Sequence, residues 1–442
     1  MFRIGYRLPT TATAPFCPSQ VRETVPIALS APAFTRFRRY AGIGFLVAVG
    51  YMDPGNWATD IEAGSRFGYA LLCVILASSL IAMLLQSLCV RLGMASGKDI
   101  AQLCREHFSP RVNLFLWALA QIAIIACDFA EVLGTALALK LLFGLPLVFG
   151  IAITALDTVI VLVMQGKGQL HVERFVAVLI AIISFSFLSE IIMSKPDWNG
   201  VAQGFIPNPA VFADPTAWLL AIGILGATVM PHNLYLHSSA VTSRKVAHTV
   251  EAKSDAIRLL TWDTILTLSC AFFVNAAILV VSASVFHYSG HNDVASIDDA
   301  HNLLAPLLGT SLAATIFAVA LFASGQSSTI TGTMAGQVIL EGFLNLRIPC
   351  WQQRLITRLC ALVPALIAIS LMGDHAIGKL LVVSQVVLSM QLPFAVVPLV
   401  LFCSRRSIMG EWTIGVALRI VSWAVSIIII AANLYLLYVL FS

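Results

Sequence analysis

Two proline-containing stretches decide the fold of this chain: Asp53-Pro54-Gly55-Asn56 and Met230-Pro231-His232. Each lies in an otherwise apolar segment. Proline lacks a backbone N–H and displaces the carbonyl four residues earlier, so each stretch predicts a break in a helix. Broken backbone at membrane depth is tolerated only where protein or a polar cavity satisfies the freed groups. The two breaks therefore predict a polar site inside a membrane protein.

The composition agrees with a protein of many membrane spans. Of 442 residues, 59% are hydrophobic and 11% charged, and the mean hydropathy is +0.91, whereas a soluble protein carries roughly 25% charged residues. Most apolar runs reach the ~20 residues of a spanning helix, and the first and sixth do so once the segment after the break is added. We expect an all-α polytopic membrane protein with eleven transmembrane helices: 40–51, 69–95, 112–143, 145–165, 175–194, 217–229, 259–286, 313–342, 355–372, 379–403 and 412–440.

The distribution of positive charge predicts the orientation. Arg36, Arg38 and Arg39 directly precede the first span, which places the N-terminus in the cytoplasm. With alternating loops, 21 of the 26 Lys and Arg residues fall on the cytoplasmic side, and the external loop 286–309 has none. The first 35 residues lack the apolar core of a secretory signal. We expect a multi-pass protein of the cytoplasmic or inner membrane with its C-terminus outside, no nucleic-acid partner and no obligate protein partner.

The spacing of the breaks predicts the domain organisation. A cytoplasmic tail (1–39), expected to be flexible, precedes one membrane transport domain (40–442). The breaks are 177 positions apart, and five spans begin with each. This pattern is typical of inverted repeats that each donate a broken helix to a midplane site. We place the repeats at about 40–194 and 216–403 and an extra helix at 412–440. The nine cysteines lack CxxC spacing, so neither a disulfide nor a zinc cluster is expected.

Four groups at the breaks are candidate metal ligands. Asp53 and Asn56 flank a Pro-Gly turn, so their side-chain oxygens can converge. A carboxylate near the bilayer centre costs about 2.5–3.5 kcal/mol, which a cation or proton offsets. Alternatively, Asp53 caps the following half-helix, but a cap does not explain the second break. There, Pro231 frees the carbonyl of Ala227, and Met230 adds a thioether that favours Mn²⁺, Fe²⁺ or similar ions over Mg²⁺ or Ca²⁺. These ions and H⁺ would be transported substrates, and no cofactor is expected.

The histidines and acids of the spans are candidates for a proton pathway. His232 and His237 follow the second break; either can relay protons, ligate metal or bond a carbonyl. For His237, relay and structural roles remain equally open. In the third span, Asp128 and Glu131 share one helix face, and Arg358 begins the ninth span together with Arg354. These groups predict a charged route on the cytoplasmic side of the site, with a static ion-pair lock as the alternative.

Other polar residues of the spans carry weaker signals. Gln385 suits an auxiliary metal ligand, although an interhelical hydrogen bond is the commoner role for such an amide. Asp157 and Glu190 remain unassigned and outside the predicted site. The polar run 325–333 in the eighth span is explained by close helix packing and hydroxyls that bond across helices.

With these residues in place, the chain resembles the Nramp family of proton-coupled divalent metal transporters. The likeness rests on Asp53-Pro54-Gly55-Asn56, on 226–232, on 325–337, on Asp128-Phe129-Ala130-Glu131 and on Ser384-Gln385, and it covers about 40–440. It implies a LeuT-like fold of ten spans plus one, and import of Mn²⁺ or Fe²⁺ into the cytoplasm down the proton gradient.

The resemblance also implies the roles of single residues. Metal would be held by Asp53, Asn56, Met230 and the Ala227 carbonyl, with Gln385 joining in some conformations. Protons would pass by Asp53, His232, Asp128, Glu131 and the Arg358 region. One departure matters: family members usually carry a Glu seven residues before the aspartate of the third span, and Gln121 stands there. The salt-bridge network is therefore expected to be shorter or the proton coupling weaker.

Three other functions are less consistent with these residues. A symporter of the same fold for an amino acid or Na⁺ would present half-helix N-termini to a carboxylate, and Met230 and Asp53 argue against it. An intramembrane metal-dependent hydrolase would need an open metal site with a general base, as in HExxH, and the sequence has no such motif. A receptor-like relative that does not transport is disfavoured by the complete motifs. We therefore expect a transporter and not an enzyme.

Overall fold

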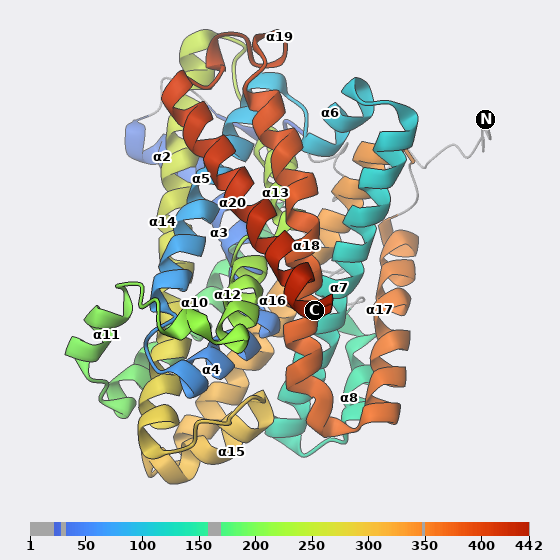
Figure 1. Cartoon of the computed structure of the whole chain (residues 1–442). Coiled ribbons are helices and arrows are strands. Elements are labelled where there is room, and N and C mark those ends of the chain that lie inside the picture. The colour runs from blue at the N-terminus through green and yellow to red at the C-terminus, as the bar shows by residue number, and fades with distance from the viewer. Residues whose placement is uncertain (1–21, 28–31, 158–168, 347–349, 442) are drawn as a thin grey trace.

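The computed structural model describes residues 22–27, 32–157, 169–346 and 350–441. Within them the chain is helical apart from one pair of two-residue strands (Figure 1). Nine helical stretches in this part are long and apolar enough to cross a membrane: Leu72–Ser96, Pro110–Phe143, His171–Ser194, Pro215–Ser243, Val250–Ser289, Ser311–Leu344, Gln352–Met372, Ile377–Cys403 and Val416–Tyr438. The prediction of an all-α polytopic membrane protein is confirmed.

Two of the eleven predicted spans are absent from those nine for identifiable reasons. The first is interrupted at Asp53, so neither of its helices is long enough alone. The fourth, predicted over 145–165, extends into 158–168, outside the described residues. The predicted tail lies outside them over 1–21 and 28–31, and the eleven-span count stays a prediction.

The helices of the N-terminal half follow the predicted spans to within a few residues, apart from the fourth. They are α2 (Ala33–Tyr40), α3 (Ile43–Ala48), the 3-10 helix η1 (Val49–Met52), α4 (Pro54–Phe67), α5 (Leu72–Ser96), α6 (Ile100–His107), α7 (Pro110–Phe143), α8 (Leu147–Thr154), α10 (Gln169–Ser194) and α11 (Trp198–Gly204).

The C-terminal half contains the second broken helix and the longest spans. Its elements are η2 (Val211–Ala213), α12 (Pro215–Thr228), α13 (Pro231–Ala240), η3 (Val241–Ser243), α14 (Val250–Val285), η4 (His287–Ser289), α15 (Ile297–Leu308), α16 (Ser311–Leu344), α17 (Cys350–Met372), η5 (Asp374–Ala376), α18 (Ile377–Cys403), α19 (Arg406–Met409), η6 (Gly410–Trp412) and α20 (Val416–Phe441).

The strand pair joins the N-terminal segment to the chain that leaves α13. Strand β1 (Val25–Pro26) pairs in parallel with β2 (Arg244–Lys245). Arg244 is buried, forms an ion pair with Glu173 of α10 at 3.1 Å, and donates to the carbonyl of Tyr40. The ends of α2 and α13 are thereby tied together at one end of the bundle.

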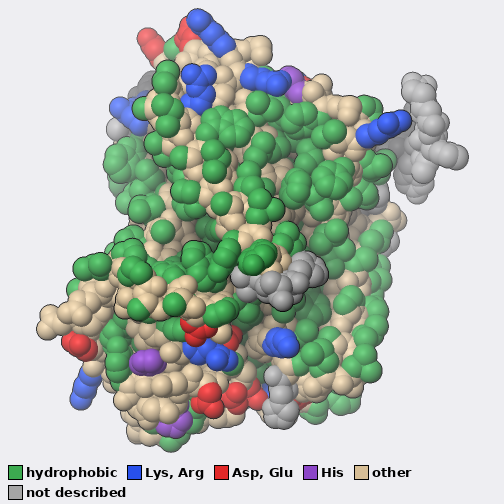
Figure 2. Space-filling view, in the orientation of Figure 1, with side chains coloured by type: hydrophobic (Ala, Val, Ile, Leu, Met, Phe, Trp, Pro, Cys, Tyr) green, Lys and Arg blue, Asp and Glu red, His purple; other side chains and the backbone are tan. Residues whose placement is uncertain are grey.

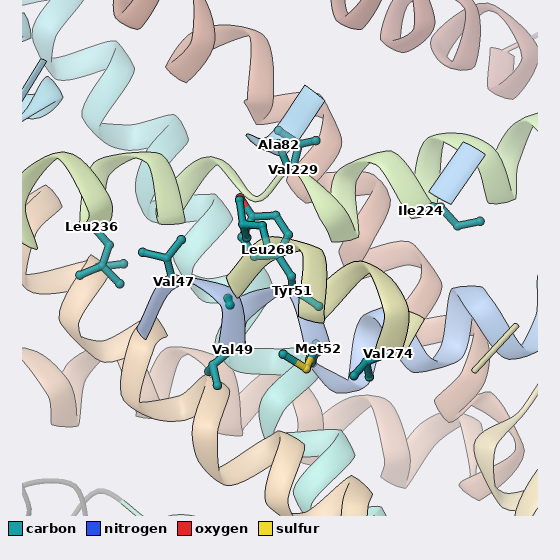
Figure 3. Close-up of a cluster of buried hydrophobic side chains, with 14 of the residues drawn as sticks. Val47, Val49, Tyr51, Met52, Ala82, Ile224, Val229, Leu236, Leu268 and Val274 are labelled. Atoms are coloured by element: carbon teal, nitrogen blue, oxygen red, sulfur yellow. The ribbon is translucent and has the colours of Figure 1, made fainter. Parts of the chain in front are cut away.

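The two broken helices lie at the centre of the bundle. Helix α4 packs against α14, α12, α18 and α7, while α13 packs against α16, α5 and α18. Trp57 of α4 is fully buried between Phe187 and Phe317, with ring centroids 4.7 and 5.1 Å apart. Figure 3 shows the apolar side chains that flank the breaks, with Tyr51 and Met52 near the first and Val229 at the second.

The surface separates an apolar belt from charged ends. In Figure 2, hydrophobic side chains cover most of the middle of the molecule, and Lys and Arg gather at the end near α6 and α19. Acidic side chains gather at the opposite end, where Lys140 pairs with Asp298 and Asp374 at 3.1 Å each. This distribution is consistent with a bundle that spans a bilayer.

Glycines permit the closest helix approaches. A Cβ at Gly226 in α12 would overlap the backbone carbonyl of Gln385 in α18, and one at Gly134 in α7 would overlap the ring of Pro54. The neighbouring backbone cannot give way as a flexible side chain would, so α12 and α18 require glycine at position 226 for their observed contact.

We expect Gly226→Ala to destabilise the fold by about 1–3 kcal/mol, the usual cost of overpacking a core. The measurement is thermal unfolding of the detergent-solubilised protein. Gly415→Ala is the matched control, because no heavy atom lies within 4 Å of a Cβ there. Equal melting temperatures for the two variants would contradict the packing argument.

Candidate metal site

The first break is built by Asp53 together with Pro54 and Asn56. Asp53 has an extended backbone conformation and is the N-cap of α4, with Pro54 in the first turn. Its Oδ1 accepts from the backbone N–H of Asn56 at 2.9 Å and from the Asn56 side-chain Nδ2 at 2.8 Å. The capping role weighed from the sequence is therefore present, and it occupies only one oxygen of the carboxylate.

The backbone carbonyls freed at this break are satisfied by side chains of other helices. Asn275 of α14 donates to the carbonyl of Tyr51 at 2.9 Å. The carbonyl of Met52 accepts from Trp57 Nε1 at 3.2 Å and from the hydroxyl of Ser324 in α16. These contacts are the protein environment that an interrupted helix needs at membrane depth.

The second break meets the first. Helix α12 ends at Thr228, Val229 and Met230 have non-helical backbone angles, and α13 begins at Pro231. The carbonyl of Ala227 accepts from Asn56 Nδ2 at 3.1 Å. One amide nitrogen thus lies between an oxygen of Asp53 and the carbonyl that Pro231 was predicted to free.

Two further predicted residues adjoin this centre. Gln385 of α18 points its Nε2 at the second oxygen of Asp53, at 3.4 Å, and a Cβ at Gly55 would overlap the Gln385 amide. Met230 is fully buried, and its sulfur lies 3.8 Å from Nδ2 of Asn233. Asn233 was not predicted from the sequence: it lies one helical turn after Met230, but its contact with Gly50 depends on how α13 packs against the first broken helix.

The candidate site is enclosed and chemically mixed. Asp53, Asn56, Met230, Ala227 and Gln385 are each at most 1% exposed. Within the described residues, no group of three or more His, Cys, Asp or Glu could hold a metal ion. Metal binding here would therefore depend on amide, thioether and carbonyl donors added to a single carboxylate.

The two predicted histidines have different surroundings. His232 lies with Nε2 at 3.6 Å from the thiol of Cys127, and its Nδ1 has no hydrogen-bond partner among the described residues. His237 lies with Nδ1 at 2.8 Å from Gln86 Oε1, and Gln86 Nε2 donates to the hydroxyl of Tyr51 at 2.7 Å. His237 is thus held in a hydrogen-bonded chain that crosses to η1.

The predicted acids and arginines come together, with one addition. Glu131 accepts from the Cys127 thiol at 3.4 Å and lies 4.0 Å from Arg358 Nη1. Arg358 Nη2 donates to Asp157 Oδ2 at 3.2 Å, so Asp157, which the sequence analysis left outside the site, belongs to this cluster. A lone acid in a span gave no sequence signal that identified its partner 201 positions away.

Asp128 and Arg354 complete the surroundings of this cluster. A Cβ at Gly332 in α16 would lie 2.9 Å from Glu131 Oε1 and 3.4 Å from Asp128 Oδ1, so both acids face that glycine. Both terminal nitrogens of Arg354 are buried without a hydrogen-bond partner in the described part of the chain. The predicted pairing of the acids with arginine is therefore observed for Arg358 and not for Arg354.

Curated proteins of similar sequence and a family model both match most of this chain. The chain is 53% identical to "Divalent metal cation transporter MntH" of Nostoc sp. over 95% of each chain, and 53% identical to the protein of that name from Ralstonia nicotianae over 99% of each. The family model "Natural resistance-associated macrophage protein-like" matches residues 44–439.

Solved structures agree in fold. The manganese transporter of Eremococcus coleocola has a TM-score of 0.88 at 38% identity, covering 94% of this chain and 90% of that one. Mhp1, a nucleobase-cation-symport-1 family transporter, has a TM-score of 0.62 at 15% identity, covering 97% and 94%, and shows likeness of fold alone.

The fold and the paired breaks define a membrane protein with the architecture of secondary transporters. Within that class, the chain belongs to the Nramp family. The resemblance inferred from the motifs is confirmed.

We expect Asn275→Ala to destabilise the protein by about 1–3 kcal/mol, because it leaves the buried carbonyl of Tyr51 without a donor. Thermal unfolding in detergent measures this. Asn433→Ala is the matched control, since Asn433 donates to a carbonyl four residues earlier in its own helix. A loss of stability no greater than that of Asn433→Ala would show that the Asn275 hydrogen bond does not stabilise the break.

Proposed function

We propose that this chain is a secondary transporter that imports divalent transition metal ions, such as Mn²⁺ and Fe²⁺, together with protons by alternating access. The observation that carries the proposal is the meeting of the two breaks at Asn56, between Asp53 Oδ1 and the Ala227 carbonyl. The names of the relatives, which are divalent metal cation transporters, support the same conclusion.

The geometry at Asn56 suits a cation. Two acceptor oxygens, from Asp53 and Ala227, converge on the partial positive charge of one amide NH₂ group. If the Asn56 amide turns its oxygen inward, all three oxygens face the same point, which a dication would occupy. Gln385 is close enough to Asp53 to join them through its own amide oxygen, which has no hydrogen-bond partner among the described residues.

The thioether of Met230 favours transition metal ions over Mg²⁺ and Ca²⁺. Sulfur is a soft donor that transition metals accept and that Mg²⁺ and Ca²⁺ gain little from. Met230 is the N-cap residue of α13 and makes no side-chain capping bond, so its sulfur is committed only to the long contact with Asn233. We assign the metal ligands to Asp53, Asn56, Met230, the Ala227 carbonyl and Gln385.

The proton route follows the contacts beyond the metal site. In this route Asp53 exchanges its proton for the metal ion. Beyond it, His232 lies next to the Cys127 thiol, and that thiol lies next to Glu131. Glu131 in turn faces Arg358. We assign Asp128 to the same route. For His237, the bond to Gln86 favours a structural role over a relay.

The proposed topology has eleven spans, with inverted repeats at about 40–194 and 216–403, in the cytoplasmic membrane. The Lys and Arg residues near α6 and α19 support a cytoplasmic position for that end (Figure 2). The N-terminus would then be cytoplasmic and the C-terminus outside.

The alternative cargo has less support. Mhp1 and the amino-acid-bound MhsT share the fold at 15% identity, which carries no information on the substrate of this chain. An anionic substrate would be repelled by Asp53, whose carboxylate lies at the centre of the site. Hydrolase chemistry is disfavoured by the family, whose members are named as transporters.

Asp53→Ala is expected to abolish metal uptake, because it removes the only charged ligand. Radioactive manganese uptake into proteoliposomes measures this. Glu190→Gln is the control, since it neutralises another fully buried acid outside the proposed site. Uptake by the Asp53 variant at the control's rate would refute the proposed site.

Met230→Ala is expected to keep manganese uptake measurable and to raise competition by Ca²⁺ and Mg²⁺ by about tenfold or more, as loss of about 1.4 kcal/mol of discrimination implies. Competition against manganese uptake is the measurement, and Met334→Ala in α16 is the control. Unchanged competition would remove the proposed role of the sulfur.

A further inference from the structure

Three acids and two arginines form one buried cluster between α7, α17 and the segment after α8. They are Asp128 and Glu131 of α7, Asp157 just beyond α8, and Arg354 and Arg358 of α17. Each is at most 5% exposed. Arg354 lies within electrostatic reach of all three carboxylates.

Arg358 lies closer to Asp157 than to Glu131 within the cluster. Its Nη2 donates to Asp157 Oδ2 at 3.2 Å and to the carbonyl of Thr154 at 3.1 Å. Its Nη1 lies 4.0 Å from Glu131 Oε2 and has no hydrogen-bond partner among the described residues. Arg358 is therefore anchored to Asp157 and keeps an unused donor on the side of Glu131.

The charges of the cluster do not balance when all five groups are ionised. Arginine does not release its proton in proteins, so two positive charges face three carboxylates. An uncompensated buried charge is strongly disfavoured. The cluster is neutral only when one carboxyl group holds a proton. Without Asp157 two arginines would face two carboxylates, and the cluster would be neutral without a bound proton.

We propose that Asp157 makes this cluster a store for one transported proton, with Arg358 neutralising whichever of Asp157 and Glu131 is ionised. The inference rests on the proton coupling proposed above. A proton from the direction of the metal site forms an O–H bond on Glu131 while Arg358 stays with Asp157. The proton then leaves Glu131 and passes through water to Asp157, while Arg358 turns Nη1 to the ionised Glu131. Asp157 releases its proton toward the cytoplasm as the next proton reaches Glu131, so the cluster keeps one proton throughout.

Among the described residues, one further acid acts on the cluster: the charge of Asp53 reaches Glu131, and in the proposed mechanism it is balanced at the metal site by a proton or the metal ion. Cys127 of α7 donates its thiol hydrogen to Glu131 at 3.4 Å, and His232 of α13 lies on the far side of that thiol. From α16, Gln326 lies beside Asp157 and Gly332 lies against Glu131, and neither can ionise. Neutralising Asp157 balances the cluster and leaves both the proposed metal ligands and the Cys127–Glu131 contact unchanged.

The test compares Asp157→Asn with Asp157→Glu and Glu190→Gln in proteoliposomes. Radioactive manganese uptake and a trapped pH-sensitive dye together give the number of protons moved per metal ion. In Asp157→Asn we expect manganese uptake to persist, the proton-to-metal ratio to fall by about half or more, and the pH dependence of uptake to flatten. Asp157→Glu should keep the wild-type ratio, as should Glu190→Gln.

The outcomes separate the two proposals. Absence of manganese-driven proton movement in the wild type would overturn the proposed coupling itself. A coupled wild type with an unchanged ratio and pH profile in Asp157→Asn would overturn only the proton store. If Asp157→Asn does not transport manganese, infrared spectra of the detergent-solubilised protein test the proton store instead. The store predicts that Asp157→Asn has one protonated carboxyl group fewer than the wild type. An equal carboxylic acid band would reject the inference.

Discussion

Backbone groups freed at the two helix breaks must find partners inside the protein, and the rest of the structure depends on this constraint. The carbonyl of Tyr51 takes Asn275, that of Met52 takes Trp57 and Ser324, and that of Ala227 takes Asn56. Each partner comes from a helix other than the one that supplied the carbonyl, and Trp57 reaches back from α4 across the first break to η1. The breaks therefore organise α14, α16 and the two broken helices into one polar centre within an apolar bundle.

The same constraint leaves a place for a cation. An amide NH₂ group donates to Asp53 and to the Ala227 carbonyl, and in the proposed transport function rotation of that one side chain would let a metal ion take its place. With the amide in this position, the Asp53 oxygen and the Ala227 carbonyl each have a donor. Solvent access is not needed to satisfy them, which is consistent with full burial of every proposed ligand.

The sequence predicted the features that depend on local chemistry. Proline positions located both breaks, and the four-residue offset of the displaced carbonyl identified Ala227, which the structure brings to Asn56. Features that depend on helix pairing were missed. Asn275 and Ser324 carry no local signal, since their partners lie 224 and 272 positions away. Asp157 was left unassigned for the same reason: a single acid in a span is compatible with many partners, and only the packing of α8 against α17 selects Arg358.

Helix α13 connects the separate parts of this arrangement. Within ten residues it carries Met230 at its N-cap, His232 against Cys127 of α7, and His237 against Gln86 of α5. Its far end continues into the chain segment that pairs with the N-terminal strand. Because one short helix makes these contacts, it cannot move as a rigid body without altering the thioether and both histidine contacts together. In the proposed transport function, a movement of α13 would therefore act on the metal site and on the histidine contacts together.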